Sequence, residues 1–233
     1  KEDTAQVFHI IESLKGKRSH SQAWNFIKSD AGQGYLANGT DIPAMLDDHD
    51  LWADCGPDTV AANYMAFMKR EGLSAAGLVA ESHRFLPPEK RHADLTEWYF
   101  DRLRDTHDLF HILTGYGRDA LGEQCVLLFT HGQAPSHGHL LIGYAGAINI
   151  KKTVRSSAPV IKACRQAQRT GKSCPPLVAM PIRELLAMDL QDARSRLNIP
   201  QPTHYQECHR VWADEGVDPY DLLGKQAPEA QPA

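Results

Sequence analysis

The segment between residues 104 and 123 limits the possible folds of this chain more than any other. It holds His107, Asp108 and His111 within five residues, and Glu123 follows twelve residues after His111. On an α-helix the two histidines lie one turn apart on the same face, and Asp108 falls with them inside an arc of roughly 100°. Two imidazoles and a carboxylate that converge in this way are typical ligands of Zn²⁺ or another divalent first-row metal.

Glu123 can join these three side chains only if the chain turns back. On one unbroken helix it would lie about 18 Å beyond His111. Gly115 and Gly117 suit a helix C-terminus, and a second helix over residues 119–130 would return Glu123 to the histidines. The spacing therefore predicts a metal site on a helix–turn–helix hairpin with its ligands facing inward. The alternative is that the histidines are ordinary core residues and that both carboxylates face solvent.

The residues before the hairpin predict one long helix that carries the histidines. Leu95, Tyr99, Leu103, Phe110 and Leu113 follow an approximate four-three periodicity, which is typical of a helix with one buried face. The histidines would then sit on or beside that buried face, where a shared ligand has to lie.

The whole chain predicts an all-α fold. Helical periodicity recurs along most of its length, and we find neither an alternating strand pattern nor an internal repeat. We expect a single-domain bundle of about eight helices over residues 1–225, with a Gly-rich loop at 31–40 and one helix between Pro181 and Leu197. The Pro/Ala-rich residues 226–233 are expected to be a disordered tail.

Composition excludes several classes of protein. The net charge of −4 gives no reason to expect nucleic acid as a partner. No apolar run approaches the 18 residues or so that a transmembrane helix needs, and the N-terminus is like neither a secretory signal nor a transit peptide. The five cysteines are widely spaced and form no Cys-x-x-Cys pair, which argues against a disulfide framework and suits a reducing compartment.

Two stretches after the hairpin suggest lipid or anion contacts. Gly138, Gly143 and Gly146 are small residues that let either a chain-like ligand or another helix approach closely. Residues 151–172 contain seven Lys or Arg residues and no acidic residue, beginning with Lys151, Lys152 and Arg155. This basic stretch could face anionic lipid head groups or a phosphate, or it could be a solvated surface.

The His107-Asp108 pair also fits a second class of enzyme, the metal phosphohydrolases of the His-Asp type. Those enzymes need a histidine well upstream and an aspartate well downstream on separate helices. Here His83 or His92 and Asp119 could take these roles. A second histidine one turn after the His-Asp pair is not required in that class, so it remains the runner-up.

The spacing of the four candidate ligands resembles a known motif. His107-Asp108-Leu109-Phe110-His111, followed after eleven residues by Glu123, is similar to the His-Asp-x-x-His-(x)11-Glu motif of the coenzyme Q (ubiquinone) biosynthesis family. That family includes the 4-hydroxy-3-methoxy-5-polyprenylbenzoate decarboxylase of mitochondria and its bacterial relatives. The resemblance is sharp over residues 102–130 and looser elsewhere.

This resemblance implies a fold, a metal and an activity. It implies an all-helical protein that binds a divalent metal through His107, Asp108, His111 and Glu123, with Zn²⁺ as the first choice and Fe²⁺, Co²⁺ or Mn²⁺ as alternatives. The metal-dependent reaction would remove the ring carboxyl of a polyprenylated hydroxybenzoate, coupled to hydroxylation at the same carbon. Asp108 or Glu123 could serve as the proton acceptor.

The resemblance also implies partners and a location. We expect contact with a polyprenylated aromatic lipid and with other quinone-biosynthesis proteins, and a homodimer is compatible with both. The expected location is peripheral, on the cytoplasmic face of a bacterial inner membrane or the matrix side of a mitochondrial inner membrane. The competing hypothesis is a non-catalytic lipid-binding scaffold whose metal is structural.

Overall fold

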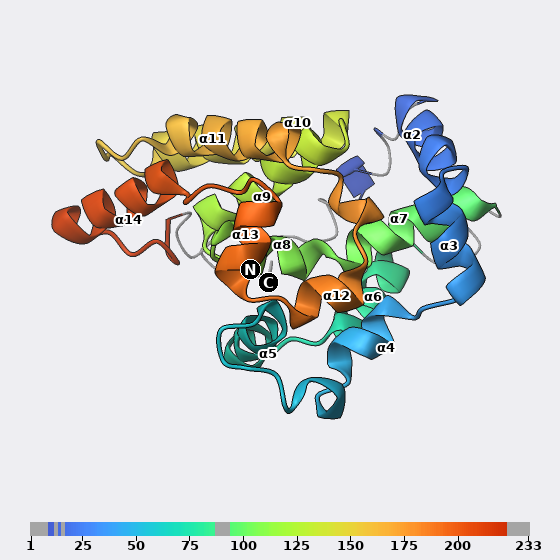
Figure 1. Cartoon of the computed structure of the whole chain (residues 1–233). Coiled ribbons are helices and arrows are strands. Elements are labelled where there is room, and N and C mark those ends of the chain that lie inside the picture. Colours follow the sequence, from blue (N-terminus) through green and yellow to red (C-terminus); the bar gives the residue numbers. More distant parts are fainter. Residues whose placement is uncertain (1–8, 12–13, 15–16, 87–93, 223–233) are drawn as a thin grey trace, which may run out of the picture.

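The apolar run Cys125–Phe129 forms the middle of a deeply buried helix, α9 (Ala120–Gln133). A helix that is apolar on all sides must be covered on all sides. α10 (His137–Thr153) and α11 (Val160–Ser173) supply most of this cover and run side by side in Figure 1. The computed structural model describes residues 9–11, 14, 17–86 and 94–222.

Glycines allow α9 and α11 to touch backbone to backbone. A Cβ atom on Gly171 would lie 2.1 Å from the carbonyl oxygen of Phe129, and one on Gly132 would lie 2.5 Å from that of Gln168. Any larger residue at either glycine would separate the two helices. This close approach makes the α9–α11 pair the centre of the main core.

The described residues contain thirteen α-helices, two short 3₁₀ helices and no β-strand. The predicted all-α class is therefore confirmed, although the helices are shorter and more numerous than the expected eight. The remaining helices are α2 (Lys17–Ile27), α3 (Asp30–Asn38), α4 (Ile42–Asp47), α5 (Val60–Glu71), α6 (Ala75–Phe85), α7 (Leu95–Asp105), α8 (His107–Thr114), α12 (Ile182–Ala187), α13 (Leu190–Arg196) and α14 (Thr203–Glu215), with 3₁₀ turns at Asp50–Trp52 and Leu177–Ala179. The predicted tail at 226–233 lies outside the described residues.

The loop predicted at 31–40 is wrong, because most of this stretch is helix α3. The Ser29 side chain caps its start by accepting the N–H of Gly32 at 3.2 Å, and Gly39 ends it in the left-handed conformation. Gly32 is needed for packing, since a Cβ there would lie 2.1 Å from the carbonyl oxygen of Phe26. Gly39 thus ends the helix, and Gly32 allows close packing against the backbone of Phe26.

Two predicted long helices are each broken once. The helix expected over Leu95–Leu113 breaks at Thr106, whose hydroxyl donates to the carbonyl of Arg102 at 2.9 Å, so that His107 begins a separate helix. The helix expected between Pro181 and Leu197 breaks where Asp189 caps α13. In both cases a polar side chain bonds the local backbone and competes with the continuing helix.

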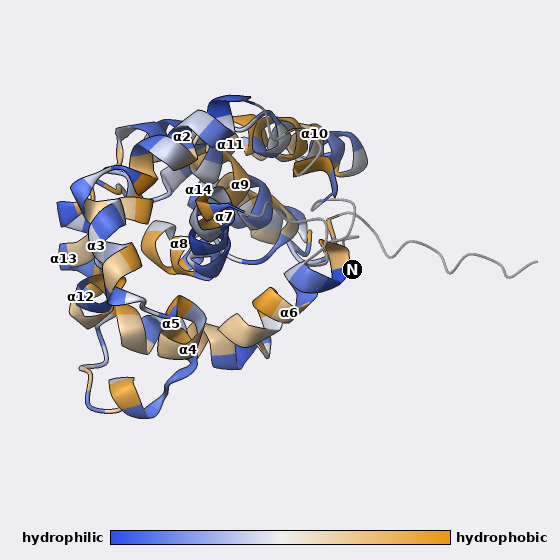
Figure 2. Ribbon diagram, turned by 90° about the vertical axis from the view of Figure 1, so that its right-hand side faces the viewer, coloured by the Kyte–Doolittle hydropathy of each residue, from blue (hydrophilic) through white to orange (hydrophobic). Residues whose placement is uncertain are grey.

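Helix α8 lies in the interior of the domain. It packs against α5, α7, α9 and α13, and Figure 2 shows it surrounded by other helices. A second, smaller core joins α2, α3 and α7 around Phe26 and Tyr99. No helix among the described residues combines the length and the apolar character needed to span a lipid bilayer.

Candidate metal centre

The helix that carries the histidines is buried up to its last residue, so its free carbonyls need partners inside the protein. Gly115 ends α8 in the left-handed conformation, with φ at 76°, and its N–H donates to His111 O at 2.9 Å. The guanidinium of Arg194 on α13 donates to the carbonyls of Leu113 and Ile112 at 2.9 and 3.0 Å. One side chain far downstream in the sequence, Arg194, therefore bonds two carbonyls at the end of this helix.

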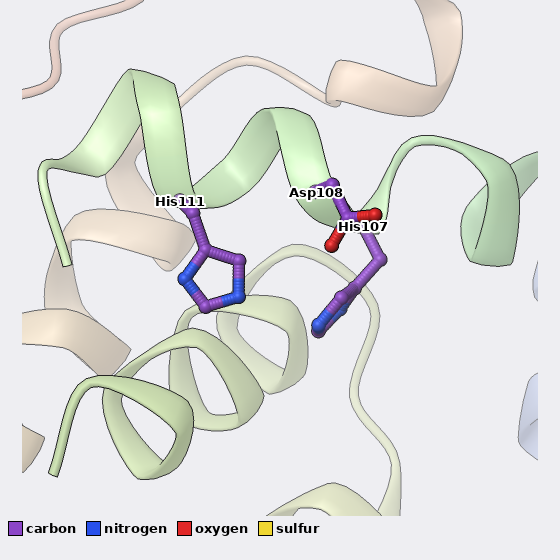
Figure 3. Close-up of side chains that lie close together, drawn as sticks. All are labelled: His107, Asp108 and His111. Carbon is purple, nitrogen blue, oxygen red and sulfur yellow. The ribbon is translucent and has the colours of Figure 1, made fainter. Parts of the chain in front are cut away.

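His107, Asp108 and His111 come together as predicted. One ligand atom from each lies within 4.8 Å of the other two, and Figure 3 shows both imidazoles projecting from the same side of α8. Asp108 and His111 are buried, whereas His107 is half-buried. Ligand atoms that are each about 2 Å from one Zn²⁺ ion can be up to about 4 Å apart, so a small adjustment would let all three share a cation.

The hydrogen bond of His111 fixes which of its nitrogens can bind a metal. Its Nδ1 lies 3.0 Å from the carbonyl oxygen of Tyr116. A carbonyl only accepts, so Nδ1 carries the proton and Nε2 keeps its lone pair. Nε2 is buried, and within the part of the chain that the structure describes it has no hydrogen-bond partner. A buried lone pair of this kind suits a metal ion, and the donor set therefore fits the predicted divalent cation.

Glu123 returns to the histidines, as the glycine break predicted. It lies in the first turn of α9, and its Oε2 is 3.7 Å from Nε2 of His111. It stands beside the tight group of His107, Asp108 and His111. Its other oxygen faces the guanidinium of Arg118 at 3.4 Å. The hairpin is thus confirmed, while the use of all four residues as ligands stays a prediction.

The protein environment keeps both histidines neutral. Burial lowers the pKa of His107, and the neighbouring His111 lowers it further. Burial also lowers the pKa of His111, despite the opposing effect of Asp108. A neutral imidazole is the form that binds metals. The ring of Phe67 on α5 stacks on His111 with centroids 5.5 Å apart, which shields this side of the site from water.

Several residues of the site were not identified from the sequence. Arg118 lies in the eleven-residue spacer between His111 and Glu123, so its proximity to the motif was a usable signal. Phe67 and Arg194 approach from α5 and α13, and their contacts depend on the tertiary fold.

The residues proposed to contact lipid or phosphate are not among the grouped metal-ligand candidates His107, Asp108 and His111. A Cβ on Gly143 would lie 2.6 Å from Leu128, one on Gly146 would lie 2.4 Å from Gln124, and one on Gly138 would lie 2.8 Å from Ile11. Tight packing against other parts of the chain therefore accounts for all three glycines. Lipid contact at these glycines stays a prediction, as does membrane or phosphate contact at the exposed Lys151, Lys152 and Arg155.

The downstream aspartate of the phosphohydrolase hypothesis has another role. The carboxylate of Asp119 accepts the N–H groups of Leu121 and Gly122 at 3.1 Å each, which caps α9, and it also accepts the hydroxyl of Tyr205. Burial acts to raise the pKa of Asp119, but hydrogen bonds from His209 and Tyr205 outweigh it, and the pKa lies below its usual value. This carboxylate is occupied in holding the hairpin, which disfavours a metal role for it.

The sequence and the fold have counterparts among known proteins. The family model of the coenzyme Q (ubiquinone) biosynthesis protein Coq4 matches residues 25–203, which is more than half of the chain. The fold is similar to the crystal structure of a protein from Nostoc punctiforme PCC 73102 that is provisionally assigned to ubiquinone biosynthesis, with a TM-score of 0.61 and 17% sequence identity. This similarity covers 86% of the present chain and 91% of the Nostoc chain. No curated protein matches the chain.

Proposed function

The chain belongs to the family of the coenzyme Q (ubiquinone) biosynthesis protein Coq4, and on that premise we propose that it is a metal-dependent carboxy-lyase of ubiquinone biosynthesis. Its substrate would be a polyprenylated hydroxybenzoate, from which it removes the ring carboxyl. His107, Asp108, His111 and Glu123 would hold the divalent metal. Zn²⁺ is the first choice, and Fe²⁺, Co²⁺ and Mn²⁺ suit the same donors.

The observation that carries this proposal is the buried Nε2 of His111, which has no hydrogen-bond partner among the described residues. It lies 3.7 Å from the Glu123 carboxylate, beside the group that ligand atoms of His107, Asp108 and His111 form. A buried nitrogen lone pair costs free energy unless it accepts a hydrogen bond or binds a cation. A cation bound here would satisfy that nitrogen and bring two carboxylates next to a reacting molecule.

The residues of the site suit the loss of a carboxyl group from an aromatic ring. When bound, the cation supplies Lewis acidity that stabilises negative charge on a ring oxygen. Asp108 or Glu123 would take the proton of the ring hydroxyl. The carboxyl would leave as CO₂, and the hydroxylation coupled to this loss would put an oxygen atom on the same ring carbon.

The coupled hydroxylation needs an oxidant, for which we propose molecular oxygen. One hydroxybenzoate and one O₂ then give one quinone, one CO₂ and one water, without a further reductant. Arg118 would pair with the substrate carboxylate, because its guanidinium is half-exposed beside Glu123. Charge-assisted pairing of this kind also orients a planar acid.

The substrate's isoprenoid tail calls for a membrane surface, and α10 offers a suitable face. Leu141 and Ile148 expose 56% and 47% of their surface on this helix, and Lys151 and Lys152 follow at its end. Apolar side chains beside a basic group favour binding to anionic lipid. We propose a peripheral site on the cytoplasmic face of a bacterial inner membrane, or on the matrix side of a mitochondrial one, where other quinone-biosynthesis proteins or a second copy could join it.

Elemental analysis of the purified protein together with a decarboxylation assay tests the proposal. We expect about one divalent ion per chain and CO₂ release from a prenylated 4-hydroxybenzoate, with both lost in the His107→Ala/His111→Ala variant. The exposed His49→Ala variant is the control and should keep both. Full metal occupancy in the double variant would refute the site.

The competing function is a lipid-binding scaffold with a structural metal. The deep burial of α8 favours it, because a metal between α8 and α9 would also stabilise the core. The same assay separates the two functions. A metal-loaded chain that binds the prenylated acid, but releases no CO₂ with or without oxygen, would support the scaffold.

A further inference from the structure

One peptide group joins the metal centre to the C-terminal helix. The carbonyl of Tyr116 accepts the proton on Nδ1 of His111 at 3.0 Å, and the N–H of the same peptide unit, which belongs to Gly117, donates to the hydroxyl of Tyr205 at 2.9 Å. A peptide group is planar, so its two ends cannot rotate independently. The hydroxyl of Tyr205 on α14 therefore helps to set the direction of the carbonyl that holds His111.

The same hydroxyl also reaches the second ligand helix. Tyr205 donates its proton to the carboxylate of Asp119, which caps α9. Glu123 lies in the first turn of that helix, and its N–H donates to the carbonyl of Asp119 at 3.1 Å. One phenol thus accepts from the turn that holds His111 and donates to the residue that starts the helix of Glu123.

The surroundings of Tyr205 hold it in place. Its ring packs edge-on against Tyr116 with centroids 5.3 Å apart, and the centroid of the His209 ring lies 4.5 Å away. A Cβ on Gly117 would lie 2.8 Å from the Tyr205 hydroxyl, so the contact requires glycine there. Nε2 of His209 lies 3.4 Å from the same carboxylate oxygen of Asp119.

We propose that Tyr205 is a positioning residue for the metal centre, because its hydroxyl sets the orientation of His111 and the separation between α8 and α9. This inference rests on the metal site proposed above and adds a residue that lies beyond the segment matched by the family model. Tyr205 would not be a ligand of the metal. It acts through the peptide group between Tyr116 and Gly117 and through Asp119.

The test compares two Tyr→Phe variants that each lose one hydroxyl. Tyr205→Phe keeps the packed ring and removes both hydrogen bonds of the hydroxyl. Tyr144→Phe is the matched control, because its hydroxyl donates to Gln168 at 2.7 Å between α10 and α11. Mutation of a residue that orients a metal ligand typically lowers metal affinity by about 10- to 100-fold. We expect a loss in this range for Zn²⁺ in Tyr205→Phe, measured by chelator competition, and none in Tyr144→Phe.

A metal-free measurement separates positioning from general stability. In ¹⁵N spectra of the histidines, the wild-type chain should show His111 with its proton on Nδ1, and Tyr205→Phe should show a mixture of the two tautomers. An unchanged Zn²⁺ affinity in Tyr205→Phe, or an equal loss in Tyr144→Phe, would overturn the proposal. If the wild-type chain binds none of Zn²⁺, Fe²⁺, Co²⁺ and Mn²⁺, the proposed function fails. The inference is then judged by the tautomer alone, and an unchanged His111 spectrum in Tyr205→Phe refutes it.

Discussion

The α8–α9 hairpin and the outer face of α10 are neighbouring parts of one helical domain, but the hairpin is buried and hydrogen-bonded by distant residues, whereas the α10 face is exposed. In the hairpin, distant residues bond the backbone, with Arg194 at the end of α8 and Tyr205 at the turn. On the outer face of α10, apolar and basic side chains point outward, and Leu141 and Ile148 are exposed.

The geometry of the hairpin therefore depends on tertiary contacts, whereas the properties of the α10 face depend on which side chains are exposed there. In the hairpin a small change must disturb several contacts at once, because interiors are close-packed and their polar groups are paired. On α10 a change alters only the contact with whatever lies outside. Substitutions in the hairpin should therefore change the free energy of unfolding, and substitutions on the α10 face should change binding to a membrane surface.

The Gly122→Ala variant should have the largest effect on stability. A Cβ there would lie 2.0 Å from the carbonyl oxygen of Gly117, so the turn and α9 must separate. We expect a loss of about 3 kcal/mol in the free energy of unfolding, near the upper end for overpacking, measured by urea denaturation of the metal-free chain.

The control for this variant is Gly34→Ala on α3, where a Cβ would meet nothing within 4 Å. This change should raise stability by up to about 1 kcal/mol, because alanine favours helix more than glycine does. Equal effects at Gly122 and Gly34 would show that the turn is not tightly packed.

The Arg194→Ala variant should cost less, about 2 kcal/mol. It removes two hydrogen bonds from a charged donor and leaves the carbonyls of Ile112 and Leu113 without their partner. The exposed Arg196→Ala, two residues away, is the matched control and should change stability by less than about 0.5 kcal/mol. Thermal unfolding of both variants compares them, and a silent Arg194→Ala would mean that water replaces the guanidinium.

The buried histidines should give the hairpin a dependence on pH. Burial lowers the pKa of His107 and His111 in the folded chain, whereas in the unfolded chain both titrate near the ordinary value of 6.5. The unfolded state then binds more protons as the pH falls through 6.5, so the metal-free fold should lose stability below that pH.

Chemical denaturation between pH 8 and pH 5 measures this slope. His111→Gln should flatten it, because the variant removes a group whose folded and unfolded states bind protons differently. The exposed His49→Gln should leave it unchanged. A wild-type slope no steeper than that of His111→Gln would contradict the neutral state assigned to the site.

The sequence predicted the hairpin because its constraint is local. The helical period places His107, Asp108 and His111 on one face, and the glycines allow the chain to turn so that Glu123 comes close to His111. The break at Thr106 escaped prediction because the apolar periodicity continues across it. The contacts of Phe67, Arg194 and Tyr205 depend on how distant helices pack, and no spacing within a single segment encodes that packing.

The outer face of α10 should show the smallest change in stability and a clear change in binding. Reversing two charges in Lys151→Glu/Lys152→Glu should shift the free energy of unfolding by less than about 0.5 kcal/mol, because both side chains are exposed. Each basic residue near an anionic surface contributes about 1 kcal/mol to binding. We therefore expect at least about a 10-fold loss of binding to vesicles of phosphatidylglycerol and phosphatidylethanolamine, measured by co-sedimentation.

The matched control is Lys17→Glu/Arg18→Glu, which reverses two adjacent, exposed charges at the start of α2. If the apolar and basic side chains of α10 act together, this control should keep nearly all of the vesicle binding, since electrostatic attraction fades within a Debye length of about 10 Å. Equal losses in the two variants would instead mean that overall charge governs binding. The α10 face would then be an ordinary solvated surface, and it would differ from the hairpin only in being exposed to solvent.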